Sequence, residues 1–260
     1  MSGVRLQQER NSMYQFFVEE NQINDKSVII VGPDVNHIKN VLRMKTGEEL
    51  SVSNGKDSKE IRCAITSVND DNIECEIRFV KEDNHELPGK IYLFQGLPKA
   101  DKMESIIQKN IELGVFSIVP VAMKRSVVKL DEKKAEAKIA RWQSIAQAAA
   151  KQSKRGIIPQ ITPLMSFKQA VEYAKENCDI KILPYEMAED MTHTREIFAG
   201  LKPGQSVAVF IGPEGGFDPS EIDIAVESGF LPVTLGKRIL RTETAGMCVM
   251  SILMYLSEDR

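Results

Sequence analysis

The sequence predicts an α/β protein with a smaller β-rich domain in front of it. From Tyr14 to about Val80, short runs rich in β-branched residues are separated by turn residues. After the polar stretch 83–89, apolar strands alternate with longer helical patterns, which is the order expected of a parallel sheet covered by helices. The chain has 260 residues, of which 42% are hydrophobic and 27% charged, so it is long enough for two globular domains.

Four strands and one helix are expected in the N-terminal domain. The strands are residues 27–31, 49–53, 60–68 and 72–80, and the helix lies near residues 35–43. In the last two strands apolar and polar side chains alternate, as they do when one face of a hairpin is buried. These elements predict a small closed or half-closed β domain. The polar residues 1–12 precede a second methionine, Met13, and we exclude them from the fold as a leader or a disordered extension.

The second domain is predicted from its apolar runs. Strands are expected at residues 90–97, 116–121, 180–183, 207–211 and 231–235, and helices at 101–113, 131–152 and 242–256, with further helices between the later strands. In the first helix Met103, Ile106 and Ile111 mark one face, and Gly114 ends it. The last helix is apolar around nearly its whole circumference, so we expect it to be buried on most sides.

Composition excludes several classes of protein. Four scattered cysteines form no Cys-x-x-Cys pair and there are only three histidines, so we expect reduced thiols, no metal and a cytoplasmic location. No run approaches the roughly 20 apolar residues that a membrane helix needs, and no membrane contact is expected. The formal net charge is −3. Residues 124–155 nevertheless hold ten Lys and Arg against three acidic residues, which indicates either a contact with a polyanion or a solvated helix face.

The strongest local motif is SVAVFIGPEGGFDPSE, residues 206–221. An apolar strand ends at Ile211, a glycine-rich turn follows, and Asp218 can cap a helix that begins at Pro219. Ligands of open α/β sheets bind at the carboxyl ends of strands, and glycines there let a ligand approach the backbone. The alternative is a turn that needs glycine only for its shape. The motif is neither a Walker loop nor GxGxxG.

A second motif is LGKRILRTETAGMCVMSIL, residues 235–253. A short loop carries Lys237, Arg238 and Arg241, and Thr242 then opens the apolar helix. Three cations within five residues directly before an apolar helix are an unusual arrangement, which makes this loop a candidate functional segment. The alternative is a helix start whose charged side chains simply extend into solvent.

These two motifs together carry a resemblance. GPEGGF at 212–217 followed by LGKRILRTETA at 235–245 resembles the signature pair of the ribosomal RNA small subunit methyltransferase E family (RsmE), a branch of the SPOUT superfamily. Further segments resemble the family in order: HIKNVLRMKTGEEL at 37–50, NG at 54–55, KMESIIQKNIELGV at 102–115, RSVV at 125–128, RW at 141–142 and AAAKQSKRGIIPQI at 148–161. The likeness runs from Met13 to the last residue.

The resemblance implies a fold and an activity. It implies a PUA-like β-barrel domain that binds RNA over residues 13–84, and a SPOUT-type, trefoil-knotted methyltransferase domain over residues 85–260. The implied reaction is S-adenosylmethionine-dependent methylation of N3 of a specific uridine in 16S ribosomal RNA. Because SPOUT relatives pair two knotted domains, the resemblance also implies a homodimer whose interface includes or adjoins the helix 242–256.

The site residues are carried over by position. The cofactor pocket is implied to consist of three strand-end loops, with the residues Leu183, Pro184, Glu186, Ile211, Gly212, Pro213, Glu214, Gly215, Gly216, Leu235, Gly236, Ile239, Leu240, Thr242 and Ala245. Such glycine-rich loops suit a cofactor without phosphate, because adenine and ribose bind backbone amides and carbonyls. Arg241 is the expected catalytic side chain, since it offers two parallel donors to a base oxygen or a phosphate. Glu243 is a candidate base for the uridine N3 proton, although it could pair with Arg241 or cap the helix, and Glu214 has the same ambiguity.

RNA contacts are expected from the basic segments. The candidates are Lys39, Arg43, Lys45, Arg125, Lys154, Arg155 and Arg238. Residues 13–88 hold nine basic and fifteen acidic residues, so the first domain can touch RNA only through a local patch.

Two other classes compete with the methyltransferase. One is a non-catalytic RNA-binding module, against which the intact GPEGGF and RILRTETA loops argue. The other is a Rossmann-type dehydrogenase, which needs a glycine fingerprint after its first strand, and residues 93–102 contain none.

Overall fold

The computed structural model describes residues 13–82, 85–188 and 190–258, so the segment 1–12 that the sequence suggests is a leader lies outside it. The chain divides into two compact units, residues 1–83 and 84–260, and each is described by itself.

The N-terminal unit is a mixed five-stranded sheet that encloses its own core. The strands β1 (Gln15–Phe17), β2 (Ser27–Val31), β3 (Glu49–Ser53), β4 (Lys59–Val68) and β5 (Asn72–Glu82) lie in the order β1-β3-β4-β5-β2. The pair β1–β3 is parallel and the other pairs are antiparallel. The core beneath them includes Phe16, Ile30, Leu50 and Ile73, all almost fully buried. The four expected strands are confirmed, and β1 is an addition that is too short to give a periodic pattern.

The expected helix near residues 35–43 is present in a different form. A single α-helical turn, α1 (Pro33–Asn36), continues into a π-helical segment, η2 (His37–Val41), and Ile38 holds this segment on the core. A further short turn, η1 (Glu20–Gln22), lies between β1 and β2. The π-helical segment ends at Val41, and Arg43, with a φ of 55°, then turns the chain away from it.

The C-terminal unit is a parallel α/β sheet. Its strands are β6 (Ile91–Gly96), β7 (Ser117–Ala122), β8 (Gln160–Ile161), β9 (Met165–Ser166), β10 (Ile180–Pro184), β11 (Val207–Ile211) and β12 (Leu231–Val233). The order is β12-β10-β11-β6-β7-β8, with β9 paired to β7. Every pairing in this sheet is parallel. The five expected strands are confirmed; β8 and β9 have only two residues each and are not visible in the sequence pattern.

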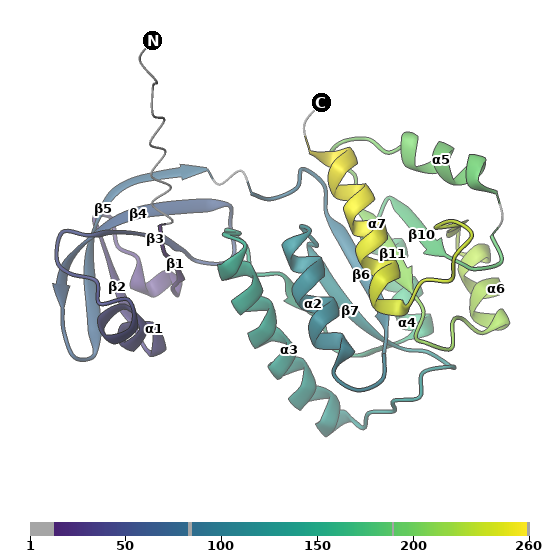
Figure 1. Cartoon of the computed structure of the whole chain (residues 1–260), viewed down its shortest axis with the longest axis horizontal. Helices are drawn as coiled ribbons and strands as arrows, with labels where there is room; N and C mark the ends of the chain where they lie inside the picture. The colour runs from purple at the N-terminus through teal and green to yellow at the C-terminus, as the bar shows by residue number, and fades with distance from the viewer. Residues whose placement is uncertain (1–12, 83–84, 189, 259–260) are drawn as a thin grey trace, which may run out of the picture. The chain divides into compact units, whose positions relative to one another are not determined.

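Helices cover the sheet. They are α2 (Lys102–Glu112), α3 (Glu132–Gln152), α4 (Phe167–Asn177), α5 (Met191–Ala199), α6 (Pro219–Glu227) and α7 (Thr242–Ser257). Helix α2 contacts both α3 and α7, and Figure 1 shows these three helices side by side. The core between the sheet and α4 and α6 is aromatic, with the rings of Phe94 and Phe210 stacked at 4.3 Å. Such pairs add about 0.5–1.5 kcal/mol beyond their buried area.

Two helix starts follow directly from the sequence. The Asp218 side chain accepts a hydrogen bond from the Ser220 amide, and the Asp218 amide donates to Glu221 Oε2 at 2.9 Å, so the expected capping box begins α6. Ser166 and Gln169 form a second capping box at the start of α4. These caps satisfy amides that a helix start leaves without partners, each at a gain of about 1 kcal/mol.

The burial expected for the last helix is wrong for the single chain. Gly246, Val249 and Leu253 of α7 are buried, but Tyr255 is 76% exposed. Sequence periodicity records which side chains are apolar, and it does not record whether the same chain covers them. One apolar side of α7 therefore remains open within the described part of the chain.

Candidate cofactor site and basic surface

The three loops expected to bind the cofactor follow neighbouring strands. Strand β10 pairs with β11 on one side and with β12 on the other, and all three run parallel. The loops that follow them, carrying Tyr185, Gly212 and Gly236, therefore leave the same edge of the sheet. A hydrogen bond from the Tyr185 amide to the Val233 carbonyl, 3.0 Å long, joins the first of these loops to β12. Adjacent carboxyl ends form the ligand-binding edge of an open α/β sheet.

Glycine is required in the loop after β11. The Gly216 amide donates to the Pro213 carbonyl at 2.9 Å and Gly216 has a φ of 68°, so the loop closes as a tight turn. A Cβ on Gly212 would come within 3.2 Å of the Gly216 backbone. Beneath the turn, a Cβ on Gly96 would lie 2.7 Å from the Pro213 ring. The glycines thus let the turn pack closely on itself and on β6, where a larger residue would collide. The sheet edge outside the three strand ends, bordered by their loops, is called the crevice below.

The loop after β12 is held at its base and open at its tip. The Thr234 amide donates to Thr194 Oγ1 at 3.0 Å, and the Gly236 amide donates to Thr234 Oγ1 at 3.3 Å. Gly236 has a φ of 104°, a conformation that favours glycine. Beyond it Arg238 is exposed and Ile239 is 86% exposed. Because Arg238 and Ile239 are exposed beside a strand end, both side chains are accessible to a ligand or a partner.

A buried hydrogen-bond chain supports the crevice from behind. Gln95, which is fully buried at the end of β6, donates through Nε2 to Thr242 Oγ1 at 2.8 Å. Thr242 Oγ1 donates in turn to the Gly212 carbonyl at 2.7 Å. The chain joins β6, the start of α7 and the glycine turn. Sequence reasoning missed Gln95, although it is the one polar side chain in the buried run IYLFQG of β6.

Ion pairs support the same turn from its outer side. Both oxygens of Glu214 accept from the Lys99 amide, at 3.0 and 3.3 Å, and Lys102 Nζ lies 3.0 Å from Glu214 Oε1. Burial alone would raise the pKa of Glu214, but the backbone amides and the Lys102 ammonium outweigh burial and lower that pKa. Glu214 is therefore an ionised structural carboxylate at neutral pH, which argues against it as a proton acceptor.

Arg241 and Glu243 lie at the start of α7. Arg241 is the N-cap residue and is exposed; its carbonyl accepts from the Thr244 and Ala245 amides, but its side chain forms no hydrogen bond or ion pair with any residue that the structure describes. Glu243 Oε2 lies 3.4 Å from Lys102 Nζ. Arg241 is thus available to a ligand, whereas Glu243 already faces a cation.

The other expected cofactor residues differ in what they can offer. The side chains of Leu183 and Ile211 are buried in the core, so only their backbone atoms can face a crevice. Pro184 and Leu240 are half-buried, and Glu186 is exposed. The structure brings all three loops to one sheet edge without assigning a ligand contact to any of these residues.

The basic residues expected to contact RNA lie on both units, and most of them are exposed. Arg125 lies beside the glycine turn, with its Nη1 3.2 Å from the Gly215 carbonyl and its Nε 3.9 Å from Asp218. Lys154 is exposed just after α3. In the N-terminal unit Arg43 and Lys45 are exposed, while Lys39 pairs with Asp70 at 2.6 Å. Except for Lys39, these candidates present free or solvent-accessible cations.

The expected RNA contact of Arg155 is wrong. Arg155 is only 2% exposed, and its Nε and Nη2 bind the two oxygens of Glu86 at 3.1 and 2.5 Å. Its Nη1 also donates to the carbonyls of Ile111 and Val115, at 3.1 and 2.7 Å. The guanidinium is fully engaged in closing the end of α2, so no phosphate can reach it. The run of charged residues in the sequence does not show that Arg155 is buried in an ion pair while Lys154 beside it is exposed.

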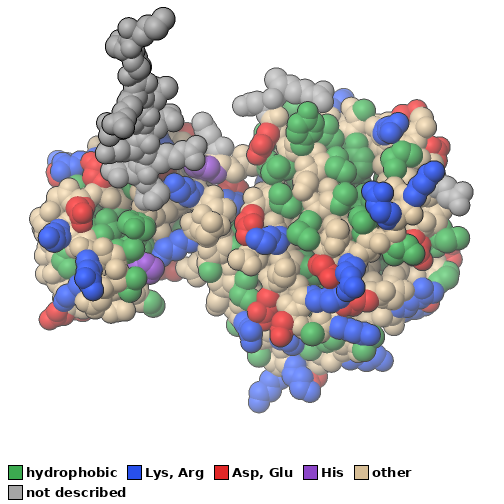
Figure 2. Space-filling model, in the orientation of Figure 1, with side chains coloured by type: hydrophobic (Ala, Val, Ile, Leu, Met, Phe, Trp, Pro, Cys, Tyr) green, Lys and Arg blue, Asp and Glu red, His purple; other side chains and the backbone are tan. Residues whose placement is uncertain are grey.

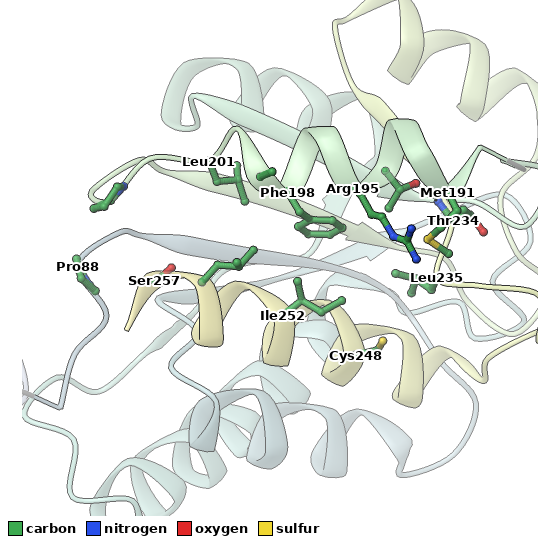
Figure 3. A pocket seen from close by; sticks show the side chains of 14 residues that line it. Pro88, Met191, Arg195, Phe198, Leu201, Thr234, Leu235, Cys248, Ile252 and Ser257 are labelled. Carbon is green, nitrogen blue, oxygen red and sulfur yellow. Dashed lines mark hydrogen bonds between the residues drawn. The ribbon is translucent and has the colours of Figure 1, made fainter. Parts of the chain in front are cut away.

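An apolar groove adjoins the loop after β12. It has a volume of about 640 Å³ and lies between α5 and α7, with Phe198 on one wall and Cys248 and Ile252 on the other (Figure 3). Leu235 closes one end, beside Arg195. Figure 2 shows hydrophobic side chains on the surface over α7. The groove thus includes part of the open apolar side of the last helix, whereas Tyr255 lies outside it.

Three of the four cysteines are buried, and potential metal ligands are scattered over the described ranges. Within residues 13–82, 85–188 and 190–258, no group of three or more His, Cys, Asp or Glu is placed to hold a metal ion. Burial raises the pKa of Cys63, Cys75 and Cys178 to about 12, so these thiols are protonated at neutral pH. No described helix is both long and apolar enough to cross a membrane.

Comparison with known proteins defines the class. Residues 85–254 match the family model of an RNA methyltransferase domain, and residues 30–78 match that of an RNA methyltransferase PUA domain. The fold is therefore that of an RNA methyltransferase with a PUA domain.

Relatives define the family within that class. Ribosomal RNA small subunit methyltransferase E of Bacillus subtilis is 37% identical over 252 residues, which are 95% of this chain and 98% of the relative. The crystal structure of the Neisseria gonorrhoeae enzyme of that name, bound to S-adenosylmethionine, is 31% identical, has a TM-score of 0.81 and is matched over 94% of this chain and 98% of its own. A methyltransferase from Legionella pneumophila with the same bound cofactor is 34% identical, with a TM-score of 0.79 and matches over 94% and 97% of the two chains. The chain belongs to the ribosomal RNA small subunit methyltransferase E family.

Proposed function

We propose that the protein transfers a methyl group from S-adenosylmethionine to N3 of a specific uridine in 16S ribosomal RNA of the small subunit. Membership of the methyltransferase E family supports the substrate, and two relatives hold this cofactor in their solved structures. The observation that carries the proposal in this chain is the glycine-shaped crevice of three neighbouring strand ends with an unpaired arginine at its rim.

The crevice fits the proposed cofactor. Adenine and ribose are neutral and suit the exposed backbone of the turn from Gly212 to Gly216 and of the loop after Gly236. The residues proposed to hold the cofactor are those of the three loops that the sequence indicates, with Leu183 and Ile211 contributing backbone atoms alone. When bound, S-adenosylmethionine supplies an electrophilic methyl group on a sulfonium centre.

The chain's own residues have two tasks in this reaction. The first is to place uridine N3 in line with the methyl group, and Arg241 can do so by donating to a uracil oxygen or a neighbouring phosphate. The same donors stabilise the negative charge that the base gains as N3 loses its proton. The second task is to accept that proton. Glu243 is the proposed acceptor, since it lies two residues from Arg241 at the same helix start.

RNA is held, in this proposal, by the cations that remain accessible. Arg125, Lys154 and Arg238 serve in the methyltransferase unit, and Arg43 and Lys45 in the PUA unit, with Lys39 able to contribute if its pair with Asp70 opens. We propose residues 13–84 as the RNA-binding domain and residues 85–260 as the trefoil-knotted catalytic domain, acting in the cytoplasm where ribosomal subunits are assembled.

The test maps methylated nucleotides in 16S ribosomal RNA from cells that lack this protein. We expect one uridine to lose its N3 methyl group and to regain it when the wild-type chain is supplied. The Arg241→Ala variant should restore little, and Glu243→Gln less than the wild type. Unchanged methylation in the deletion strain would contradict the proposed substrate.

We also propose that the working form is a homodimer whose second copy covers the α5–α7 groove. The groove is apolar, is continuous with the open side of α7, and reaches Leu235 at the edge of the crevice. Ile252→Asp would place a charge in the covered groove and should dissociate the dimer, since a buried unpaired charge is strongly disfavoured. Tyr255→Asp is the matched control, because Tyr255 lies on α7 outside the groove. Sedimentation that finds a fully active wild-type monomer would contradict the dimer.

A further inference from the structure

One lysine joins three separate segments at the rim of the crevice. Lys102 is the first residue of α2, and its ammonium lies 3.0 Å from Glu214 Oε1 and 3.4 Å from Glu243 Oε2. Glu214 belongs to the glycine turn after β11, and Glu243 to the first turn of α7. A single charge therefore ties α2, the cofactor turn and the start of α7 together.

The position of Lys102 is unfavourable for its own helix. The start of a helix carries a partial positive charge, so a cation there is repelled, whereas Glu243 at the start of α7 is attracted. The two carboxylates offset this repulsion. The pKa of Lys102 is raised, first by its hydrogen bond to Glu214, which agrees with a cation held by its partners.

The two carboxylates depend on Lys102 to different degrees. Glu214 also accepts from the Lys99 amide, so it would keep its place without the lysine. Glu243 Oε2 is out of contact with solvent and accepts no hydrogen bond from any described residue. The Lys102 ammonium is thus the charge that balances Glu243, and Glu243 is the carboxylate that the loss of Lys102 would release.

An alternative cation for Glu243 is Arg241. It stands two residues earlier at the same helix start and has no partner among the residues described. Since an arginine beside an unbalanced carboxylate forms a paired, charge-assisted contact, a released Glu243 would occupy the guanidinium.

We propose that Lys102 is a positioning residue that keeps Glu214 and Glu243 paired to itself, so that the Arg241 guanidinium stays free for the RNA substrate. The inference deepens the proposed function and rests on the role given above to Arg241. It assigns Lys102 no contact with RNA or cofactor.

The experiment measures equilibrium binding of a 16S ribosomal RNA fragment without cofactor, over a range of salt concentrations. Lys102→Met should weaken binding about tenfold. It should also lower the salt slope, which is the slope of the logarithm of RNA affinity against the logarithm of salt concentration, by about one, the change expected for the loss of one phosphate contact. Lys102→Arg should keep the wild-type slope. Lys109→Met is the matched control, since Lys109 lies on the same helix and pairs with Glu112. Lys102→Gln repeats the test if melting shows the methionine variant to be unstable.

The decisive variant is Lys102→Met combined with Glu243→Gln. If Lys102 acts by keeping Glu243 from Arg241, removing that carboxylate restores the slope, and the two substitutions are strongly non-additive. A slope that stays low in the double variant would place Lys102 itself on the RNA and overturn the proposal, as would a wild-type slope in folded Lys102→Met.

Arg241→Ala separates this inference from the proposed function. If Arg241→Ala binds and methylates RNA like the wild type, the proposed role of Arg241 is wrong and the inference falls with it. If Arg241→Ala lowers the slope while Lys102→Met does not, only the role of Lys102 is wrong.

Discussion

Replacing Thr242 by valine removes one hydroxyl group and keeps the shape of the side chain. That hydroxyl is 2.7 Å from the Gly212 carbonyl and 2.8 Å from Gln95 Nε2, and Thr242 is 6% exposed. A buried polar group left without its partner costs about 1–3 kcal/mol. Gln95 keeps its second bond, to the Gly96 carbonyl, and Gly212 is only half-buried, so we expect a loss of about 2 kcal/mol in the free energy of unfolding.

The same substitution should weaken cofactor binding. Without its hydrogen bond the turn at Gly212 is free to shift, and we expect a fall in S-adenosylmethionine affinity of about tenfold, or roughly 1.4 kcal/mol. Urea unfolding measures the stability and titration calorimetry the affinity. Thr244→Val is the control, because Thr244 is exposed on the same helix. The reasoning would be refuted if Thr242→Val and Thr244→Val unfolded at the same urea concentration and bound the cofactor equally well.

Three further predictions concern neighbouring features. Arg155→Ala should lower the free energy of unfolding by about 3–5 kcal/mol, because it leaves the Glu86 side chain, only 15% exposed, without its guanidinium partner. Lys154→Ala should instead leave stability unchanged and lower the salt slope of RNA binding by about one, and the reverse pattern would contradict both assignments. Because the pKa of Glu214 is lowered by folding, its stabilising contribution is complete above the ordinary value of 4.5 and is lost as the pH falls further. The melting temperatures of wild type and Glu214→Gln should therefore differ by a constant amount above about pH 6 and converge in acid, and a constant difference down to pH 3 would argue against this ion pair. Gly236→Val should strain the backbone by about 1–3 kcal/mol and abolish cofactor binding, whereas Gly204→Val, with a similar φ of 82° in a loop outside the crevice, should bear the strain and keep its affinity.

The sequence predicts those parts of the fold that depend on neighbouring residues. The turn from Gly212 to Gly216 and the capping box of Asp218 and Glu221 depend on residues a few positions apart, and both are present. The long strands and helices repeat their apolar residues often enough to be recognised from the sequence. Strands β8 and β9 have only two residues each and are too short to show such a repeat.

The supports of the site could not be predicted because their partners are distant in sequence. Gln95 and Thr242 are 147 residues apart, and Lys99 and Glu214 are 115 apart. The error at Arg155 has the same origin. Its partner Glu86 lies 69 residues earlier, and a single sequence gives no sign that this arginine turns inward while Lys154 beside it stays in solvent.

The two supports of the glycine turn act on opposite sides of one loop. A neutral, buried chain from Gln95 through Thr242 fixes the Gly212 carbonyl, and an ionic network from Lys102 fixes Glu214. Because a methyl transfer in line depends on position, a crevice fixed from both sides loses little free energy in ordering itself when the cofactor binds. The same network balances Glu214 and Glu243, and the Arg241 guanidinium has no partner within the described part of the chain. The ionic support of the turn and the availability of the arginine are therefore two consequences of the position of Lys102 at the start of α2.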